Sequence, residues 1–241
     1  MSVSTRRVRA IFRKELREYR RNRQIVVSMA VLPLIFSVQP FIQIFALPAS
    51  GAGALLHVHS LVYMLGIPAI VPATVAAYAV AGERAQGTLE PVLTTPIRRE
   101  ELLLGKALAA LVPTLAVSYG VFGVFVAAIE LFAQPPVASA VLGGPELLAQ
   151  LFFTPLVAAW SIWLSIAISA RSSDPRVAAQ LSVIASVPPI VVTTVIAVGG
   201  IHVTLGLAIG LAAALLLLDG LGWRIVSVTF DRERLVTGTR S

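Results

Sequence analysis

The sequence contains no cysteine and has few charged residues. Without cysteine, the protein has no disulfide bond, no thiolate metal site and no cysteine nucleophile. Charged residues make up only 13% of the 241 residues and hydrophobic residues make up 57%, which is far from the composition of a soluble domain. The composition therefore predicts an all-α membrane protein that crosses the bilayer several times.

Acidic residues are scarcer than basic ones, and the formal net charge is +7. A protein that binds nucleic acid would gather its basic residues on one face of a folded soluble domain. Here the lysines and arginines flank apolar segments instead. They indicate membrane topology, with membrane lipid and no nucleic acid as the expected surroundings.

Six apolar segments have lengths near the ~20 residues that a helix needs to cross a bilayer. We place the six transmembrane helices at about residues 24–47, 57–81, 107–130, 147–169, 177–199 and 203–223. All 19 basic residues fall before the first segment, in the loop 82–106, between the fourth and fifth segments, or from residue 224 to the last residue, 241. The positive-inside rule then predicts a multi-pass protein of the cell membrane with both termini in the cytoplasm, so residues 224–241 form a cytoplasmic tail.

Residues 1–23 carry nine basic side chains, and apolar residues recur among them at helical spacing. This pattern predicts an amphipathic interfacial helix. Two interpretations stay open, a topogenic tail that only sets orientation and a connecting helix that packs against a partner. The apolar face consists of Val8, Ile11, Phe12, Leu16 and Tyr19.

A charged island, residues 82–106, lies between the second and third apolar segments. Gly87 is suited to end a helix, and Thr88 can cap a short helix that carries Glu90 in its first turn. Pro96 disfavours helical geometry at Thr95, so we expect another helix to begin at Pro96 with Thr95 as its N-cap.

The island has the pattern GER-x-x-GTLE-x-x-L-x-TP-x-x-R-x-E-x-LLGK. This pattern resembles the cytoplasmic loop of type-2 ABC (ABC-2) exporter permeases. The resemblance implies that the loop contains a coupling helix and docks on an ATPase. The residues that carry this expectation are Glu83, Arg84, Gly87, Thr88, Leu89, Glu90, Leu93, Thr95, Pro96, Arg99 and Glu101.

The resemblance also implies how the complex is assembled. Two ABC ATPase subunits would bind the ATP and Mg²⁺, and a second permease copy or a homologue would complete the membrane part. The amino-terminal helix would be the connecting helix against the ATPase, through Phe12, Leu16 and Tyr19.

The sequence offers no phosphate-binding loop of its own. Gly105-Lys106 comes nearest, but Glu100 and Ala107 stand where a Walker motif needs glycine and Ser or Thr. We therefore expect no ATPase site, no cofactor and no metal in this chain. His57, His59 and His202 map near the outer face, as interfacial histidines or, alternatively, as ligands of a metal or haem.

Polar groups within the apolar segments are few. Asp219 is the ionisable one, and it is expected either to form an interfacial salt bridge with Arg224 or to relay protons. Gln39 and Gln43, four residues apart, either line a possible translocation path or bond neighbouring helices.

Prolines and small residues suggest how the segments bend and pack. Prolines occur in the first five segments, and the pair Pro188 and Pro189 favours a broken fifth segment. Small residues at four-residue spacing predict close helix contacts, within the chain or between two copies. These are Ser161, Ser165 and Ser169 in the fourth segment and Gly206 and Gly210 in the sixth.

Three functions are compatible with these observations. The first is the permease subunit of an ATP-driven ABC exporter. The second is an ion-coupled secondary transporter or channel, for which Asp219 is the candidate residue. The third is a membrane scaffold that recruits a soluble partner without transporting anything.

Overall fold

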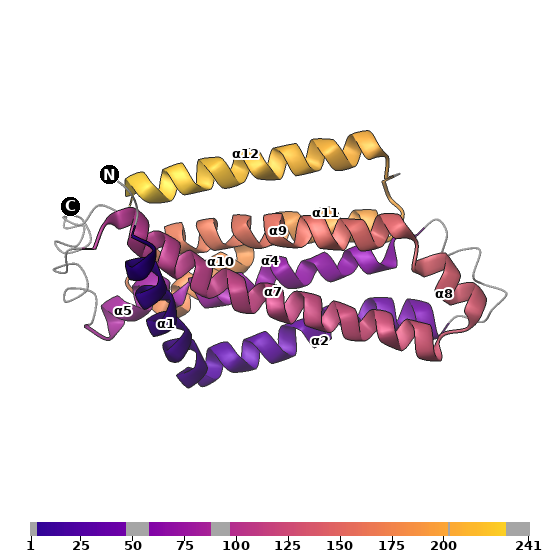
Figure 1. Ribbon diagram of the computed structural model, residues 1–241, viewed down its shortest axis with the longest axis horizontal. Helices are drawn as coiled ribbons and strands as arrows, with labels where there is room; N and C mark the ends of the chain where they lie inside the picture. Colours follow the sequence, from indigo (N-terminus) through magenta and orange to yellow (C-terminus); the bar gives the residue numbers. More distant parts are fainter. Residues whose placement is uncertain (1–3, 47–57, 88–96, 202, 230–241) are drawn as a thin grey trace.

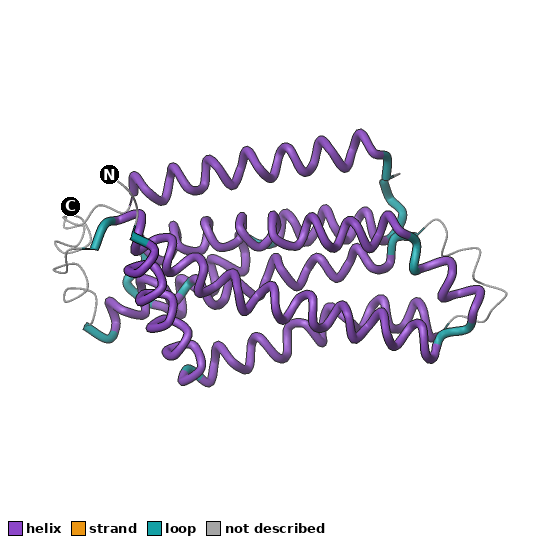
Figure 2. The backbone as a smooth tube through the Cα atoms, in the orientation of Figure 1, coloured by secondary structure: helices purple, strands orange, loops and turns teal. Residues whose placement is uncertain are grey.

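The protein is a bundle of long helices that lie side by side (Figures 1 and 2). The computed structural model describes residues 4–46, 58–87, 97–201 and 203–229. Six helical segments in this part are long and apolar enough to cross a membrane, and no strand occurs in it, so the predicted fold class is confirmed. These segments are Arg23–Phe45, Ser60–Ala85, Arg99–Phe132, Pro145–Arg171, Pro175–Ala197 and Leu205–Val228.

The amino-terminal helix α1 (Thr5–Arg21) precedes the first span and runs across the direction of the bundle (Figure 1). Asn22 ends α1 in an extended conformation and also caps α2 (Arg23–Phe45), because its side chain accepts hydrogen bonds from the backbone N–H groups of Gln24 and Ile25. Asn22 therefore forms the turn between α1 and α2. The apolar face of α1 buries Val8 and Ile11 against protein, chiefly α7.

The second span is central in the bundle and consists of three consecutive helices. These are the 3-10 helix η2 (Ser60–Leu65), α4 (Gly66–Ala76) and α5 (Tyr78–Ala85). The break between α4 and α5 is covered by Ser169, whose hydroxyl accepts hydrogen bonds from the N–H groups of Val80 and Ala81 and donates one to the carbonyl of Ala77. A polar side chain from another span thus completes the backbone bonding that the break leaves open.

The third span, α7 (Arg99–Phe132), has 34 residues and is about 51 Å long at 1.5 Å per residue. A hydrocarbon core of ~30 Å is shorter than this, so one or both ends of α7 extend beyond it. The helix begins at Arg99 with Arg98 as its N-cap, and the prediction that it begins at Pro96 is wrong. The side chain of Glu101 accepts a hydrogen bond from the backbone N–H of Arg98, which stabilises this later start.

The connection between α7 and the fourth span contains a short helix, α8 (Pro135–Val141), which the sequence analysis missed. The fourth span is α9 (Gly144–Arg171), which packs most extensively on α4 and α12. Ser161, Ser165 and Ser169 are all buried on α9, so the prediction of a closely packed serine face is confirmed.

The fifth span is broken but crosses the whole bundle. It consists of α10 (Pro175–Ala185) and α11 (Val187–Ala197), which meet at Ser186, two residues before the proline pair begins. Pro188 and Pro189 lack the N–H groups that would continue the hydrogen-bond ladder of α10, which explains the break. By contrast, Pro33, Pro113 and Pro155 lie inside helices that continue past them.

The sixth span, α12 (Leu205–Thr229), lies at the periphery of the bundle (Figure 1). Gly206 and Gly210 are both exposed, and no atom of a described neighbouring segment comes within 4 Å of a methyl group added at Gly210. The predicted glycine contact is therefore not made within the described part of this chain.

Candidate functional site

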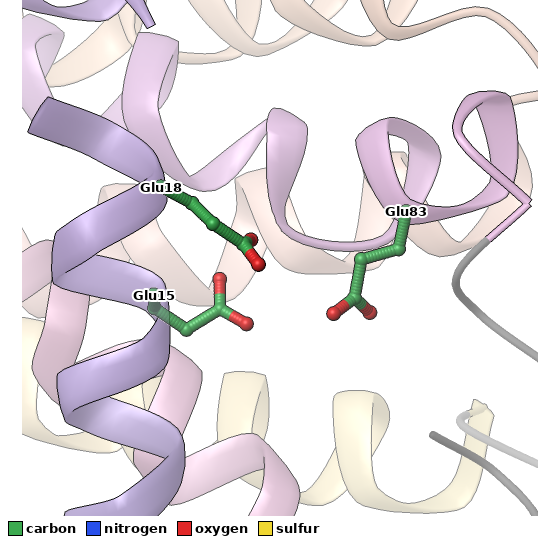
Figure 3. Close-up of side chains that lie close together, drawn as sticks. All are labelled: Glu15, Glu18 and Glu83. Atoms are coloured by element: carbon green, nitrogen blue, oxygen red, sulfur yellow. The ribbon is translucent and has the colours of Figure 1, made fainter. Parts of the chain in front are cut away.

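A group of buried charges lies at the end of the bundle where α5 ends and α7 begins (Figures 1 and 3). Its centre is Lys106, whose side chain is fully buried on α7. The ammonium group of Lys106 donates to the Glu15 carboxylate at 2.8 Å and to the carbonyl of Ala79 at 2.6 Å, and it lies 3.0 Å from Glu83 Oε2. One lysine of the third span therefore joins α1 to the second span.

A second lysine, Lys14, contacts the same carboxylates from the surface side. It pairs with Glu83, lies 3.5 Å from Glu15 Oε1, and lies 3.2 Å from Glu18 Oε1. Partial burial opposes protonation of Lys14, but the hydrogen bond to Glu83 and the carboxylates of Glu15, Glu83 and Glu18 outweigh it and raise the pKa of Lys14 above its usual value of 10.5. We call Lys14, Glu15, Glu18, Glu83 and Lys106 the lysine–glutamate network.

The carboxylates of the network could in principle hold a metal ion, since one oxygen from each of Glu15, Glu18 and Glu83 lies within 4.8 Å of the others (Figure 3). Oxygen ligands of this kind suit Mg²⁺ or Ca²⁺. The ammonium groups of Lys14 and Lys106 already bond to these oxygens, however, and compensate their charge. We therefore assign the group as an ion-pair network.

The geometry of α7 allows α1 to approach closely enough for this network to form. A methyl group at Gly105 would lie 2.6 Å from Ile11 Cγ2 and 3.3 Å from the carbonyl oxygen of Val8. Gly105 thus permits the contact between the two helices, and the adjacent Lys106 reaches Glu15 across it. The glycine and lysine of the LLGK motif serve packing and charge pairing together.

Tyr19 of α1 lies beside the carboxylates of the lysine–glutamate network. Its side chain is buried, and this burial, together with the charges of Glu15, Glu83 and Glu18, raises the pKa of the Tyr19 hydroxyl well above its usual value of 10.0. The hydroxyl therefore stays protonated. Phe12 is partly buried against the same apolar cluster as Tyr19, and Leu16 is also partly buried.

Glu101 forms a second junction between α1 and α7. Its buried carboxylate accepts hydrogen bonds from the backbone N–H of Ser4 at 2.8 Å and of Arg98 at 3.0 Å, and it pairs with Arg7 at 3.3 Å. The first turn of α1 is thereby attached to the first turn of α7.

Arg84 connects the end of the second span to the end of the fourth. Its guanidinium donates to the carbonyl oxygens of Ser172 at 2.7 Å and Ala170 at 3.4 Å. These carbonyls lie at the carboxyl end of α9, where a positive charge is favourable to the helix dipole.

Residues of the charged island fall into two groups. Glu83, Arg84 and Glu101 bind other parts of the chain, as described above, and Arg99 begins α7. Gly87 has a φ of 68° just after α5, which confirms it as the residue that ends this helix. The remaining predicted coupling residues, Thr88, Leu89, Glu90, Leu93, Thr95 and Pro96, lie outside the described residues.

The two glutamines of the first span have different surroundings. Gln43 accepts a hydrogen bond from the Ser60 hydroxyl at 2.7 Å and so bonds to the neighbouring second span. The buried Oε1 of Gln39 has no hydrogen-bond partner among the described residues. A role of either glutamine in a translocation path stays a prediction.

The predicted salt bridge of Asp219 is not found. No ion pair joins it to Arg224 in the described part of the chain, and its Oδ1 is buried without a hydrogen-bond partner. At the end of the bundle opposite the lysine–glutamate network, His59 Nδ1 lies 3.3 Å from Glu146 Oε1, and burial lowers the pKa of His59 below 6.5. His57 and His202 lie outside the described residues.

The sequence analysis did not single out Lys14, Glu15 and Lys106 as site residues. Two signals were present. Glu15 falls at helical spacing with Ile11 and Tyr19, on the otherwise apolar face of α1, and Lys106 directly precedes a long apolar run. An acid and a base that both stand on buried faces indicate a pair, since burying either charge alone is very costly.

Comparison with known proteins assigns a family to this arrangement. The family model described as ABC-2 family transporter protein matches residues 9–223, which include most of α1, the charged island, the first five spans and most of the sixth. The comparison with curated proteins gives no match.

Proposed function

The chain belongs to the ABC-2 family of transporter proteins, and from this premise we propose that it is the permease subunit of an ATP-driven exporter. It is a multi-pass membrane protein and a transmembrane permease of an ABC transporter. The proposal adds that a partner ATPase supplies the energy, that two such subunits serve each complex, and that a second permease copy or a homologue completes it.

The observation that carries the proposal is the joining of three elements beside the charged island. Lys106 bonds α1 and the second span, and Glu101 attaches the start of α1 to the start of α7. These contacts make α1, α5 and the first turns of α7 one unit. Because α5 and α7 flank residues 88–96, a force applied to that segment would act on this unit.

In the proposed mechanism, closure of the ATPases on bound ATP pushes on residues 88–95 and on α1. The lysine–glutamate network passes this displacement to the second and third spans. The second span contains the break between α4 and α5, and the fifth contains the break at Ser186, so both can change direction at these points. The outer end of the bundle then opens to release the substrate.

Orientation follows from the charges. The described basic residues lie on α1, at the start of α2, at the end of α5, at the starts of α7 and α10, and at the ends of α9 and α12. With six spans, all these positions are at one end of the bundle (Figure 1). The positive-inside rule supports a cytoplasmic position of this end and of both termini, in the cell membrane.

The test is co-purification through a carboxyl-terminal tag, with an ATPase assay and an export assay on reconstituted vesicles. We expect an ABC ATPase to co-purify, and we expect Leu89→Asp with Glu90→Arg to abolish its binding. Lys106→Met should leave the ATPase bound but uncouple its activity from export. Arg9→Met is the matched control, since it removes one positive charge from an exposed side chain of α1 that lies outside the lysine–glutamate network.

If Lys106→Met does not insert stably, Lys106→Gln replaces it in the test, since the amide removes the charge but can still donate a hydrogen bond to Glu15 or to the carbonyl of Ala79. Absence of any ATPase from the purified protein, or unchanged export by the Leu89→Asp, Glu90→Arg variant, would refute the proposal.

A second candidate function rests on Asp219. A buried carboxylate oxygen without a partner in a membrane span is typical of proton-coupled transporters. If Asp219→Asn abolished transport and removal of the ATPase did not, an ion-coupled mechanism would replace the proposed one.

A further inference from the structure

The exposed face of α1 carries a row of three arginines, Arg13, Arg17 and Arg21. They are four residues apart, so they lie on one side of the helix, and all three are exposed. They border a shallow groove of about 430 Å³, whose lining residues are Ala10, Arg13, Lys14, Arg17, Glu18 and Arg21.

The charge of this row is not compensated within the described part of the chain. The nearby acids are already engaged, because Glu18 pairs with Lys14 at 3.2 Å and Glu15 with Lys106 at 2.8 Å. None of the three arginines forms an ion pair with a described residue. Like charges four residues apart on a helix repel each other, so an anion bound beside the row would stabilise it.

The position of the row indicates which kind of anion can reach it. Arg21 is two residues before the first span, and α1 runs across the bundle at the end where that span begins (Figure 1). The row from Arg13 to Arg21 is about 12 Å long, and the chain turns at Asn22 from the end of the row into the span. Headgroup regions occupy roughly 5–8 Å on each side of the hydrocarbon core, so a row on a helix that crosses the bundle beside the start of the first span (Figure 1) is within reach of the lipid phosphates.

The apolar face of α1 gives a further constraint. Val8, Ile11 and Tyr19 are buried against protein, so α1 does not insert an apolar face among the acyl chains. Any affinity of this helix for the bilayer must come from its charged face. A guanidinium group binds a phosphate in a bidentate manner, which suits a headgroup better than a diffuse anionic surface.

We propose that Arg13, Arg17 and Arg21 form a binding site for the phosphate of an anionic phospholipid headgroup. Bound lipid would fix α1 against the membrane surface on one side while the lysine–glutamate network holds it to the bundle on the other. This site is independent of the proposed export function, since it requires only that the protein is in a bilayer.

The experiment compares the full-length protein with two variants that each lose three positive charges. In the first, Arg13, Arg17 and Arg21 are changed to Gln; in the control, Arg6, Arg9 and Arg20 are changed to Gln, which are exposed arginines outside the groove. Each protein in neutral detergent is titrated with phosphatidylglycerol or phosphatidylcholine, and bound lipid is counted by native mass spectrometry.

We expect the groove variant to bind phosphatidylglycerol roughly 100-fold more weakly, and the control variant to change by less than about threefold. Phosphatidylcholine should not compete. A third variant with Arg13, Arg17 and Arg21 changed to Lys keeps the net charge, and therefore the membrane orientation, but loses bidentate binding. It should be about tenfold weaker, and it decides the question if the Gln variant does not insert.

Three outcomes would overturn the site. Equal losses in the groove and control variants would mean diffuse attraction without a site. Unchanged binding by both the Gln and the Lys variants would mean that the row does not contact lipid. If lipid binding were unchanged and the groove variant instead lost a co-purifying protein in detergent, the row would be a protein-docking face.

Discussion

The second and sixth spans are similarly apolar, but they are buried to very different extents. In the most apolar stretch of the second span 83% of the residues are buried, and in that of α12 none is. Both spans contain glycine and alanine, so small residues alone do not decide which helix becomes central. The difference teaches that hydropathy identifies a span and leaves its place in the bundle open, because lipid and protein interior are similarly apolar surroundings.

Polar groups distinguish the two spans more clearly. The second span ends in Glu83, whose charge is paired with two lysines, and its internal break is covered by Ser169. The ionisable residue of α12, Asp219, has a buried oxygen that no described residue bonds. A central span is one whose polar groups are bonded by its neighbours.

The largest effect is expected from Lys106→Met, which leaves Glu15 and Glu83 without their buried partner. Breaking a buried ion pair from one side costs about 3–5 kcal/mol, and α1 should detach from the end of the second span. Thermal unfolding in detergent measures the loss. Asp219→Asn in α12 is the counterpart and should be neutral or slightly stabilising, and a comparable loss there would contradict the contrast between the spans.

The next effect concerns packing against glycine. A methyl group at Gly66 of the second span would lie 2.1 Å from Phe36 Cε1, and Phe36 is itself buried against Tyr63. Gly66→Ala should therefore destabilise the protein by about 1–3 kcal/mol. Gly210→Ala in α12 meets no described atom within 4 Å and should stabilise the helix by up to about 1 kcal/mol. The same unfolding assay measures both variants. If both substitutions changed the stability in the same direction, the prediction would be wrong.

An effect of similar size is expected from removing a hydroxyl group. Ser169→Ala leaves the N–H groups of Val80 and Ala81 without their acceptor and should cost about 1–3 kcal/mol. Hydrogen exchange at these two amides should accelerate. Ser227→Ala in α12 removes only a bond to the carbonyl of Arg224 within the same helix, and the expected change is below about 0.5 kcal/mol.

The smallest effect is a pH dependence at the start of the second span. Burial lowers the pKa of His59 below 6.5, so the unfolded chain binds this proton more tightly than the folded chain. Stability from neutral His59 is complete above pH 6.5 and declines as the pH falls below it. Melting temperatures measured between pH 7.5 and 5 should fall less steeply for His59→Gln, and identical slopes would show that His59 does not contribute.

Much of the fold could be predicted from the sequence, and the errors have physical causes. The spans were recognised because ~20 apolar residues in succession have few alternatives to a membrane helix. The start of α7 was placed at Pro96 from local capping rules, but the Glu101 carboxylate bonds to Arg98 and moves the start to Arg99. Capping rules consider only residues close in sequence, so they could not predict that Glu101 also accepts a hydrogen bond from Ser4 at the start of α1.

The candidate site was predicted in part. The motif drew attention to Glu83 and Glu101, but the network also needs Glu15, which lies 91 residues away from Lys106 in the sequence. Two residues so far apart in the sequence form no local sequence pattern from which their pairing could be predicted. The salt bridge expected for Asp219 was wrong for the same reason, since proximity of Arg224 in sequence does not ensure that the two side chains meet.

The sequence by itself determined that the chain crosses a membrane six times, that α1 is amphipathic, and that the basic residues gather at one end. These properties depend on the transfer free energy of each segment, which is a sum over its own residues. Only the tertiary structure decided that the second span is central, that α12 is peripheral, and that Lys106 binds α1. These depend on which side chains meet across spans, and a buried charge or hydroxyl selects its neighbours only when the helices are packed.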